Sequence, residues 1–160
     1  MITFSDRILS FYQGLEIKSP LPEGVVTMNP YTDETSFSFC TQFYQKFYND
    51  QNERSIILGI NPGRHGGGVT GIPFTDPVKL EHYCNIPNPF NKKTELSADF
   101  IYRMIEEFGG PELFYAKFYF LREILFSADF FGTSFILFLE HFHKSRAKSA
   151  FLFVCEIYLL

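Results

Sequence analysis

The chain has 160 residues, of which 46% are hydrophobic and 20% are charged, and its formal net charge at pH 7 is −4. The length fits one domain, and the apolar content is enough to bury a core. The acidic balance gives no argument for nucleic-acid binding, because non-specific affinity comes from neutralised phosphates. A local basic patch on an acidic protein remains compatible with it.

Simple features of the chain also disfavour a disulfide-rich or metal-binding protein, a secreted protein and a membrane-spanning protein. Cys40, Cys84 and Cys155 are widely spaced, without a CxxC pair, so neither a disulfide framework nor a clustered metal site is expected. The N-terminus has no basic segment or cleavage site typical of a secretory signal. The longest apolar run, Phe130–Leu139, is too short to span a bilayer. We expect a cytoplasmic protein with reduced cysteines that is not membrane-bound.

Two amphipathic helices are predicted in the first third of the chain. One opens near Ser5 and ends at Gly14, a plausible C-cap. The second is capped within Thr32–Ser36. Aromatic side chains recur along it at helical spacing, which indicates a core-facing stripe rather than a base-stacking platform: Phe39, Phe43, Tyr44 and Phe47.

A buried strand and a long loop follow these helices. The continuous apolar run Ser55–Ile60 predicts a parallel strand. The loop Asn61–Pro77 contains five glycines and three prolines. A short helix over Val78–Cys84 comes next.

A further helix and strand complete the readable pattern. Ser97 is a good N-cap for an amphipathic helix that reaches Phe108 and is stopped by Gly109-Gly110-Pro111. The aromatic run Phe114–Phe120 predicts a second strand. This order of elements indicates an α/β fold of three layers, with a central parallel sheet flanked by helices.

The composition changes after Phe120. Residues 121–160 contain no proline and one glycine, Gly132, and we expect one or two apolar helices there. The basic segment HFHKSRAK at 141–148 is typical of a solvated helix end.

The loop after the first strand carries the candidate chemistry. Asn61 follows that strand, at the sheet edge where open α/β folds bind ligands. The glycines allow the backbone to approach a ligand and present N–H donors, and Pro73-Phe74 adds an aromatic ring. An amide, backbone donors and a ring suit a flat ligand such as a nucleobase. Phosphate binding by a P-loop is disfavoured, because Val69-Thr70 stand where Lys-Ser/Thr would be.

The run GINPGRHGGGVTGIPF resembles the first motif of the single-strand-selective monofunctional branch of the uracil-DNA glycosylase superfamily. The segments LPEGVVTMNPY, FYQKFYND, GIPFTDP and FIYRMIEEFGGPELFY are similar to a bacterial branch of that family. The resemblance covers roughly residues 1–120. The loop matches the motif without a gap at nine positions: Gly59, Asn61, Pro62, Gly63, Gly66, Thr70, Gly71, Pro73 and Phe74.

The resemblance implies roles for several loop residues. Asn61 would hold or polarise the hydrolytic water, and Phe74 would stack on the flipped base. Backbone amides near Gly63 and Gly67 would donate to the uracil carbonyls and stabilise charge on the leaving base. Ile60 would line the pocket through its backbone.

Arg64 and His65 depart from the motif of the better-known branch. Arg64 would contact a DNA phosphate or simply face solvent. His65 would form a pocket wall, or be a packing or surface residue, rather than a catalyst. The remaining matched positions would shape the pocket loop: Gly59, Pro62, Gly66, Gly71 and Pro73.

The activity implied is hydrolysis of an N-glycosidic bond in DNA that contains uracil or a related deaminated base. The target nucleotide is flipped out, the C1′–N bond breaks with oxocarbenium character, and water attacks C1′. Neither a metal nor an organic cofactor is needed. The loop offers no lysine for a Schiff base, so lyase activity is not expected. We expect a monomer.

The chain departs from the family after Phe120. Family members carry a later His-Pro motif that holds the leaving base, but none of the four histidines here precedes proline. The strand ending at Phe120 should also run into a Pro-Leu segment, and it runs into Leu121-Arg122-Glu123.

One hypothesis is therefore a change of reading frame near Phe120. It fails if neither other frame of the coding DNA restores the Pro-Leu and His-Pro elements. The rival explanation is a genuinely divergent C-terminus. A sheet lacking its last strands would expose a buried edge, which predicts poor stability; a cooperative thermal melt would count against that.

Three interpretations stay open at this point. The first is an active glycosylase. The second is a catalytically inactive, truncated or frame-shifted fragment of such an enzyme, with weak salt-sensitive DNA binding at most. The third is an unrelated α/β protein that binds a phosphate or nucleotide through the same loop.

Overall fold

The computed structural model describes residues 1–15, 23, 28–59, 63–122 and 150–152. Three strands form a parallel sheet in the order β2-β1-β3: β1 is Ser55–Gly59, β2 is Phe118–Arg122 and β3 is Ala150–Leu152. In register, Gly59 at the end of β1 lies opposite Arg122 at the end of β2. On its other side, β1 pairs with β3 from Ile56 to Leu58.

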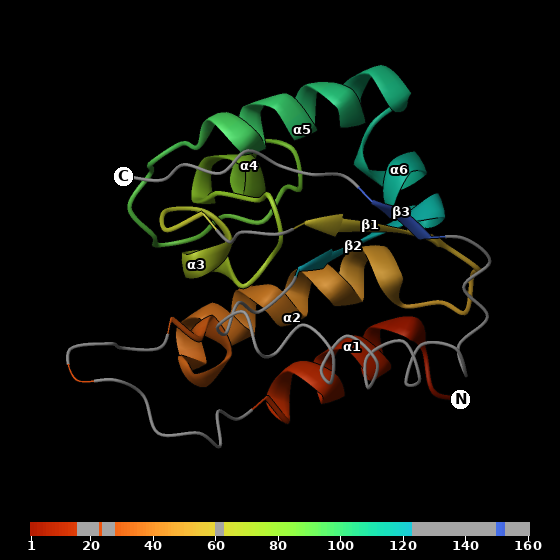
Figure 1. Ribbon diagram of the computed structural model, residues 1–160, viewed down its shortest axis with the longest axis horizontal. Helices are drawn as coiled ribbons and strands as arrows, with labels where there is room; N and C mark the ends of the chain where they lie inside the picture. The colour runs from red at the N-terminus through yellow and green to blue at the C-terminus, as the bar shows by residue number, and fades with distance from the viewer. Residues whose placement is uncertain (16–22, 24–27, 60–62, 123–149, 153–160) are drawn as a thin grey trace.

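Helices cover both faces of this sheet (Figure 1). On one side lie α1 (Phe4–Gln13) and α2 (Glu34–Tyr48), and on the other lie α4 (Pro77–His82), α5 (Leu96–Phe108) and α6 (Pro111–Lys117). The short helices are η1 (Pro30–Thr32) and α3 (Gly67–Thr70). The predicted three-layer α/β fold is confirmed, and α3 lies beyond the carboxyl ends of β1 and β2 (Figure 1).

The first two helices begin and end for local chemical reasons. The Thr3 hydroxyl accepts a hydrogen bond from the Asp6 N–H, and the Asp6 carboxylate accepts one from the Thr3 N–H, so the two residues form a capping box. Gly14 is the C-cap of α1, as predicted. The Asp33 side chain caps α2 by accepting the Ser36 N–H, within the segment that the sequence indicated.

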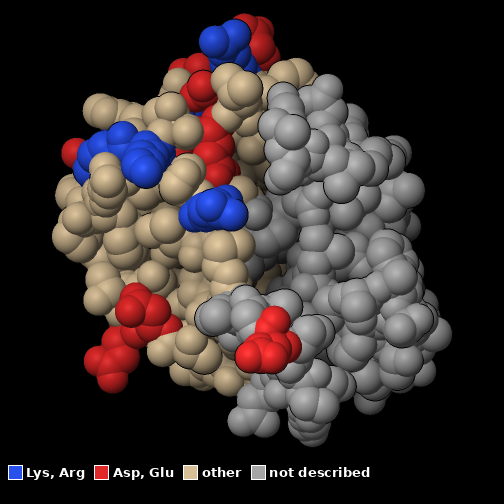
Figure 2. All heavy atoms as spheres, turned by 60° about the vertical axis from the view of Figure 1, so that its left-hand side comes forward, with Lys and Arg blue, Asp and Glu red and all other residues tan. Residues whose placement is uncertain are grey.

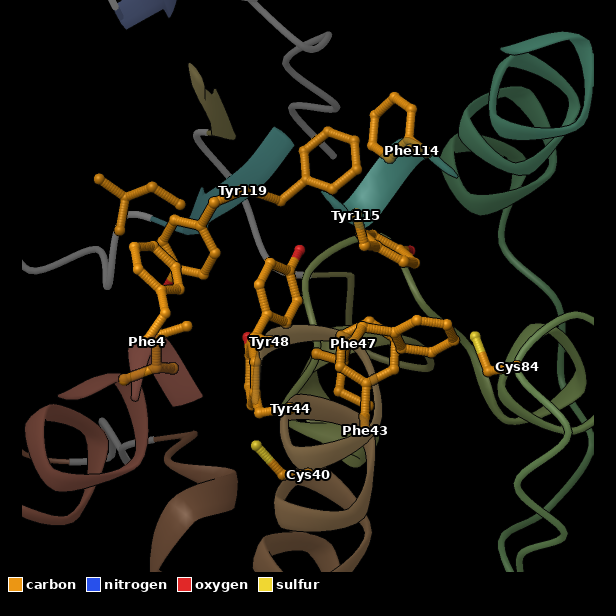
Figure 3. Close-up of a cluster of buried hydrophobic side chains, with 14 of the residues drawn as sticks. Phe4, Cys40, Phe43, Tyr44, Phe47, Tyr48, Cys84, Phe114, Tyr115 and Tyr119 are labelled. Atoms are coloured by element: carbon orange, nitrogen blue, oxygen red, sulfur yellow. The ribbon is translucent and has the colours of Figure 1, made fainter. Parts of the chain in front are cut away.

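The core between α1, α2 and the sheet is built mainly from aromatic rings (Figure 3). Phe43 packs edge-to-face on Tyr115 at 5.1 Å, and Tyr48 packs edge-to-face on Tyr119 at 5.7 Å, between ring centroids. The Tyr12 and Tyr119 hydroxyl groups lie 3.0 Å apart and hydrogen-bond within the core. The prediction that the α2 aromatic stripe faces the core is confirmed.

Two boundaries in the second half of the chain differ from the sequence predictions. Residues 114–117 of the predicted strand Phe114–Phe120 belong to helix α6, and the strand begins only at Phe118. Pro111 occupies the first turn of α6, where its missing N–H costs nothing, and Phe114 and Tyr115 are buried side by side on the helix. Ser97 lies inside α5, whose N-cap is Glu95. The stop at Gly109 is confirmed, with φ of 114°.

The segment after Phe120 contributes a strand to the sheet. The prediction of helices is wrong for Leu121 and Arg122, which end β2, and for residues 150–152, which form β3. A short apolar run does not distinguish strand from helix by periodicity, and here pairing with β1 decides it. Residues 123–149 and 153–160, including the basic run 141–148 and Cys155, lie outside the described residues. No helix in the described part of the chain is long and apolar enough to cross a membrane.

Candidate functional site

The candidate site lies where β1 ends and the glycine-rich loop begins. Gly59 is the last residue of β1, and the described chain resumes at Gly63. Ile60, Asn61 and Pro62 lie outside the described residues, so the predicted roles of Asn61 and Ile60 stay predictions. The residues from 63 to 76 are described, and they place the rest of the predicted loop at the carboxyl edge of the sheet.

Buried hydroxyl groups hold the middle of this loop. The Thr70 side chain is fully buried and donates to the Thr75 carbonyl at 2.6 Å, while it accepts the Ile72 N–H at 3.2 Å. Tyr31 donates from its hydroxyl to the Gly71 carbonyl at 3.0 Å. Gly71 has φ of 74° and ends α3, so the loop requires glycine at this position. The loop therefore has one defined path from α3 to Phe74.

Phe74 lies against the end of β1 and the middle of β2. Its ring packs edge-on against Phe120 of β2, with 5.2 Å between centroids. A Cβ atom at Gly59 would lie 2.7 Å from two atoms of the Phe74 ring, so Gly59 provides the space that the ring occupies. Phe74 itself has φ of 53°, an uncommon value for a residue with a side chain. Phe74 as a whole is only partly buried.

Glu95, the residue before α5, contacts the glycine-rich loop. The sequence did not indicate this residue as part of the site. Its carboxylate accepts the His65 N–H at 2.8 Å. A Cβ atom at Gly63 or at Gly66 would collide with this carboxylate. The spacing of the two glycines is the only sequence signal for this contact, and it does not identify the partner.

The predicted DNA-contact residues are at the surface of the loop. Arg64 and His65 are both exposed, and Gly67 is the first residue of α3. Figure 2 shows the described Lys and Arg side chains on this side of the molecule as separate groups among Asp and Glu. The described part of this face therefore has mixed charge, and non-specific attraction to phosphates does not define the site.

The buried cysteines are not activated nucleophiles. Cys40 and Cys84 are both fully buried. Burial raises the pKa of the Cys84 thiol to about 12, despite a hydrogen bond with the Tyr102 hydroxyl. The Cys84 thiol is therefore protonated at neutral pH. No group of three or more His, Cys, Asp or Glu side chains in the described ranges is arranged to hold a metal ion.

Comparisons with known proteins identify the family. The family model described as the uracil DNA glycosylase superfamily matches residues 45–157. The crystal structure of wild-type SMUG2 from Pedobacter heparinus is similar to this chain at 34% sequence identity, with a TM-score of 0.82. That match covers 99% of this chain and 77% of the SMUG2 chain. A search of curated proteins found no significant match.

Both matches continue beyond Phe120, through the segment that the sequence alone marked as atypical. They also include β1, the glycine-rich loop and β2, which together form the candidate site. The overall fold is thus shared with the SMUG2 structure over nearly the whole of this chain. The chain belongs to the uracil-DNA glycosylase superfamily.

Proposed function

We propose that this chain removes uracil, or a related deaminated base, from DNA by hydrolysing the N-glycosidic bond of a flipped nucleotide. The observation that carries the proposal is the placement of the Phe74 ring over Gly59, beside the glycine-rich loop and at the carboxyl edge of the sheet. An aromatic ring and backbone N–H groups at one edge suit a planar base with carbonyl oxygens. Family membership supports the same reaction.

In this proposal the flipped base stacks on Phe74. Backbone amides near Gly63 and Gly67 donate to its carbonyls and stabilise the negative charge that develops on the leaving base. Asn61, two residues before Gly63, orients the attacking water. Breaking the C1′–N bond leaves oxocarbenium character on the sugar, the water adds to C1′, and the products are a free base and an abasic site.

DNA carrying the damaged base is the only partner in this proposal, with Arg64 and His65 as possible DNA contacts. We further propose that the protein acts as a monomer in the bacterial cytoplasm, without a cofactor. The widely spaced cysteines support a reducing compartment.

The proposal is tested by base release from oligonucleotides. Single-stranded and double-stranded substrates containing one uracil are incubated with the purified 160-residue chain, and abasic sites are cleaved by alkali and counted. We expect cleavage at uracil and none in matched oligonucleotides with thymine. The absence of cleavage in every substrate, with salt-sensitive DNA binding retained, would favour the inactive-fragment interpretation. Preferential binding of a nucleotide over uracil would favour the third interpretation.

A substitution tests the proposed stacking of the base on Phe74. Phe74→Ala removes the ring that we place under the base, and stacking of a base on an aromatic side chain contributes about 1–3 kcal/mol. We expect uracil release to fall by roughly 10- to 100-fold. Phe108→Ala is the matched control, because Phe108 is 41% exposed and packs on Phe118. Phe118 begins β2, whereas the candidate site lies at the carboxyl end of the sheet. Equal losses in the two variants would contradict the role of Phe74.

A further inference from the structure

We propose that Glu95 is a positioning residue that holds the glycine-rich loop in its base-binding conformation. This inference rests on the proposed function and adds a residue outside the loop to its machinery. Glu95 lies 30 positions after His65 in the chain, yet its carboxylate accepts the His65 backbone N–H at 2.8 Å. A carboxylate is a stronger acceptor than a neutral group, so this contact restrains the loop backbone.

The loop leaves room for this carboxylate at two positions. Gly63 and Gly66 both face it, and a Cβ atom at either position would collide with the Glu95 carboxylate group. The first part of the loop is thus wrapped around one acidic side chain. Consecutive N–H groups in glycine-rich turns form concave sites that favour anions, and here the protein supplies the anion itself.

Glu95 is held in place from its backbone as well. The Asp76 carboxylate is fully buried; one of its oxygens accepts the Glu95 N–H at 3.0 Å, and the other accepts the N–H groups of Val78 and Lys79. The Lys79 ammonium group forms ion pairs with Asp76 and Asp99. The Glu95 backbone is therefore tied to the start of α4, directly after the loop.

The side chain of Glu95 does not cap the helix that it precedes, α5. Glu95 is the N-cap of α5, but it makes no side-chain capping hydrogen bond there. A capping side chain normally accepts an N–H of the first turn and stabilises the helix by about 1 kcal/mol. Instead of forming that capping hydrogen bond, the Glu95 side chain contacts the loop. The loop residues that it contacts begin two positions after Asn61, so their placement bears directly on the proposed water and base contacts.

The consequence for the reaction is preorganisation. Misplacing catalytic groups by about 1 Å can cost on the order of 10²-fold in rate. Without the carboxylate, the His65 N–H loses its acceptor in the loop and residues 63–66 can adopt other conformations. The loss should appear mainly in the chemical step rather than in DNA affinity, because Glu95 would repel phosphates rather than bind them.

The experiment compares Glu95→Ala and Glu95→Gln with Glu107→Ala, an exposed acidic position on the same helix. We expect Glu95→Ala to lower the single-turnover rate of uracil release by roughly 10- to 100-fold, with DNA affinity nearly unchanged. Glu95→Gln keeps an acceptor oxygen and should recover part of that rate. Glu107→Ala should behave like wild type. A higher rate in Glu95→Ala would overturn the proposal, because it would mean that the carboxylate blocks the loop.

A second test of the proposal displaces the Glu95 carboxylate from the loop without removing it. The Cβ of Gly66→Ala would push the Glu95 side chain off the loop. We therefore expect Gly66→Ala and Glu95→Ala to be non-additive, with the double variant losing little beyond the worse single variant. Fully additive losses would contradict the shared contact.

Hydrogen exchange of the free protein separates this inference from the proposed function. The amides of residues 63–68 should exchange faster in Glu95→Ala than in wild type and Glu107→Ala, in the absence of DNA. If wild type releases no uracil but this difference is found, the proposed reaction fails and the positioning contact stands. Unchanged exchange in Glu95→Ala overturns the inference whatever the activity.

Discussion

Replacing Asn61 with alanine is expected to slow uracil release by on the order of 10²-fold, the loss typical of misplacing a reacting group, here the attacking water. An amide is not a general base, so in the proposed mechanism Asn61 would orient the water and leave the departing base and the DNA charge to drive bond cleavage. Alanine removes both the acceptor and the donor of that amide. Binding of DNA should change little, since Asn61 contributes no charge.

The measurement is the single-turnover rate on single-stranded and double-stranded uracil DNA. Asn91→Ala is the matched control, because Asn91 is an exposed amide side chain in the segment before α5 and is not part of the glycine-rich loop. Wild-type activity in Asn61→Ala would remove Asn61 from the mechanism. The same result would leave the proposed reaction itself intact, because wild-type activity is measured in parallel.

Arg54→Ala is expected to destabilise the fold by about 2–4 kcal/mol, because it leaves buried hydrogen-bond acceptors without their donor, each at a cost of about 1–3 kcal/mol. Arg54 is 3% exposed and directly precedes β1. Its two terminal nitrogens each lie 2.8 Å from an oxygen of Asp50, in a bidentate pair. The guanidinium group also donates to the carbonyls of Tyr115, at 2.6 Å, and Phe47, at 3.2 Å.

Aromatic rings enclose the same guanidinium group. Its central carbon lies 5.0 Å from the centroid of the Phe4 ring and 4.8 Å from that of Tyr48. Arg54 thereby joins α1, α2 and the end of α6, and alanine would leave the two buried carbonyls without this donor. Arg54→Lys is not expected to rescue the fold, because an ammonium group cannot reproduce the bidentate and stacked contacts.

Thermal and urea unfolding measure this loss. For a chain of this size each kcal/mol lowers Tm by about 2–4 °C. Arg103→Ala, an exposed arginine on α5, is the control and should change Tm little. A Tm for Arg54→Ala equal to that of the control would show that the contacts of Arg54 contribute no net stability.

The same pair predicts a dependence of stability on pH. The hydrogen bonds from Arg54 hold the pKa of Asp50 below its ordinary value. A lowered folded-state pKa contributes stability above the unfolded-state pKa, near 3.9, and that contribution is lost as pH falls through the folded-state value. The wild-type chain should therefore lose stability below about pH 4 more steeply than Arg54→Ala, which lacks the pair.

Local sequence determined much of this protein. The apolar run at β1, the caps of α1 and α2, and the stop at Gly109 are confirmed where the residues predicted them. The caps and the stop depend on contacts between residues close in the chain, such as a capping side chain or a glycine at positive φ, and the strand was indicated by its own continuous apolar run. The glycine-rich loop was recognised for the same reason, since its own residue types define how its backbone turns.

Tertiary structure decided the features that depend on distant residues. The run from Pro111 to Phe120 divides into α6 and β2 because its buried rings must meet α2 and the sheet as well as one another. Residues 150–152 become a strand by pairing with β1. Glu95 contacts the loop while the Asp76 carboxylate accepts its backbone N–H, and no periodicity in the sequence encodes a contact across 30 positions.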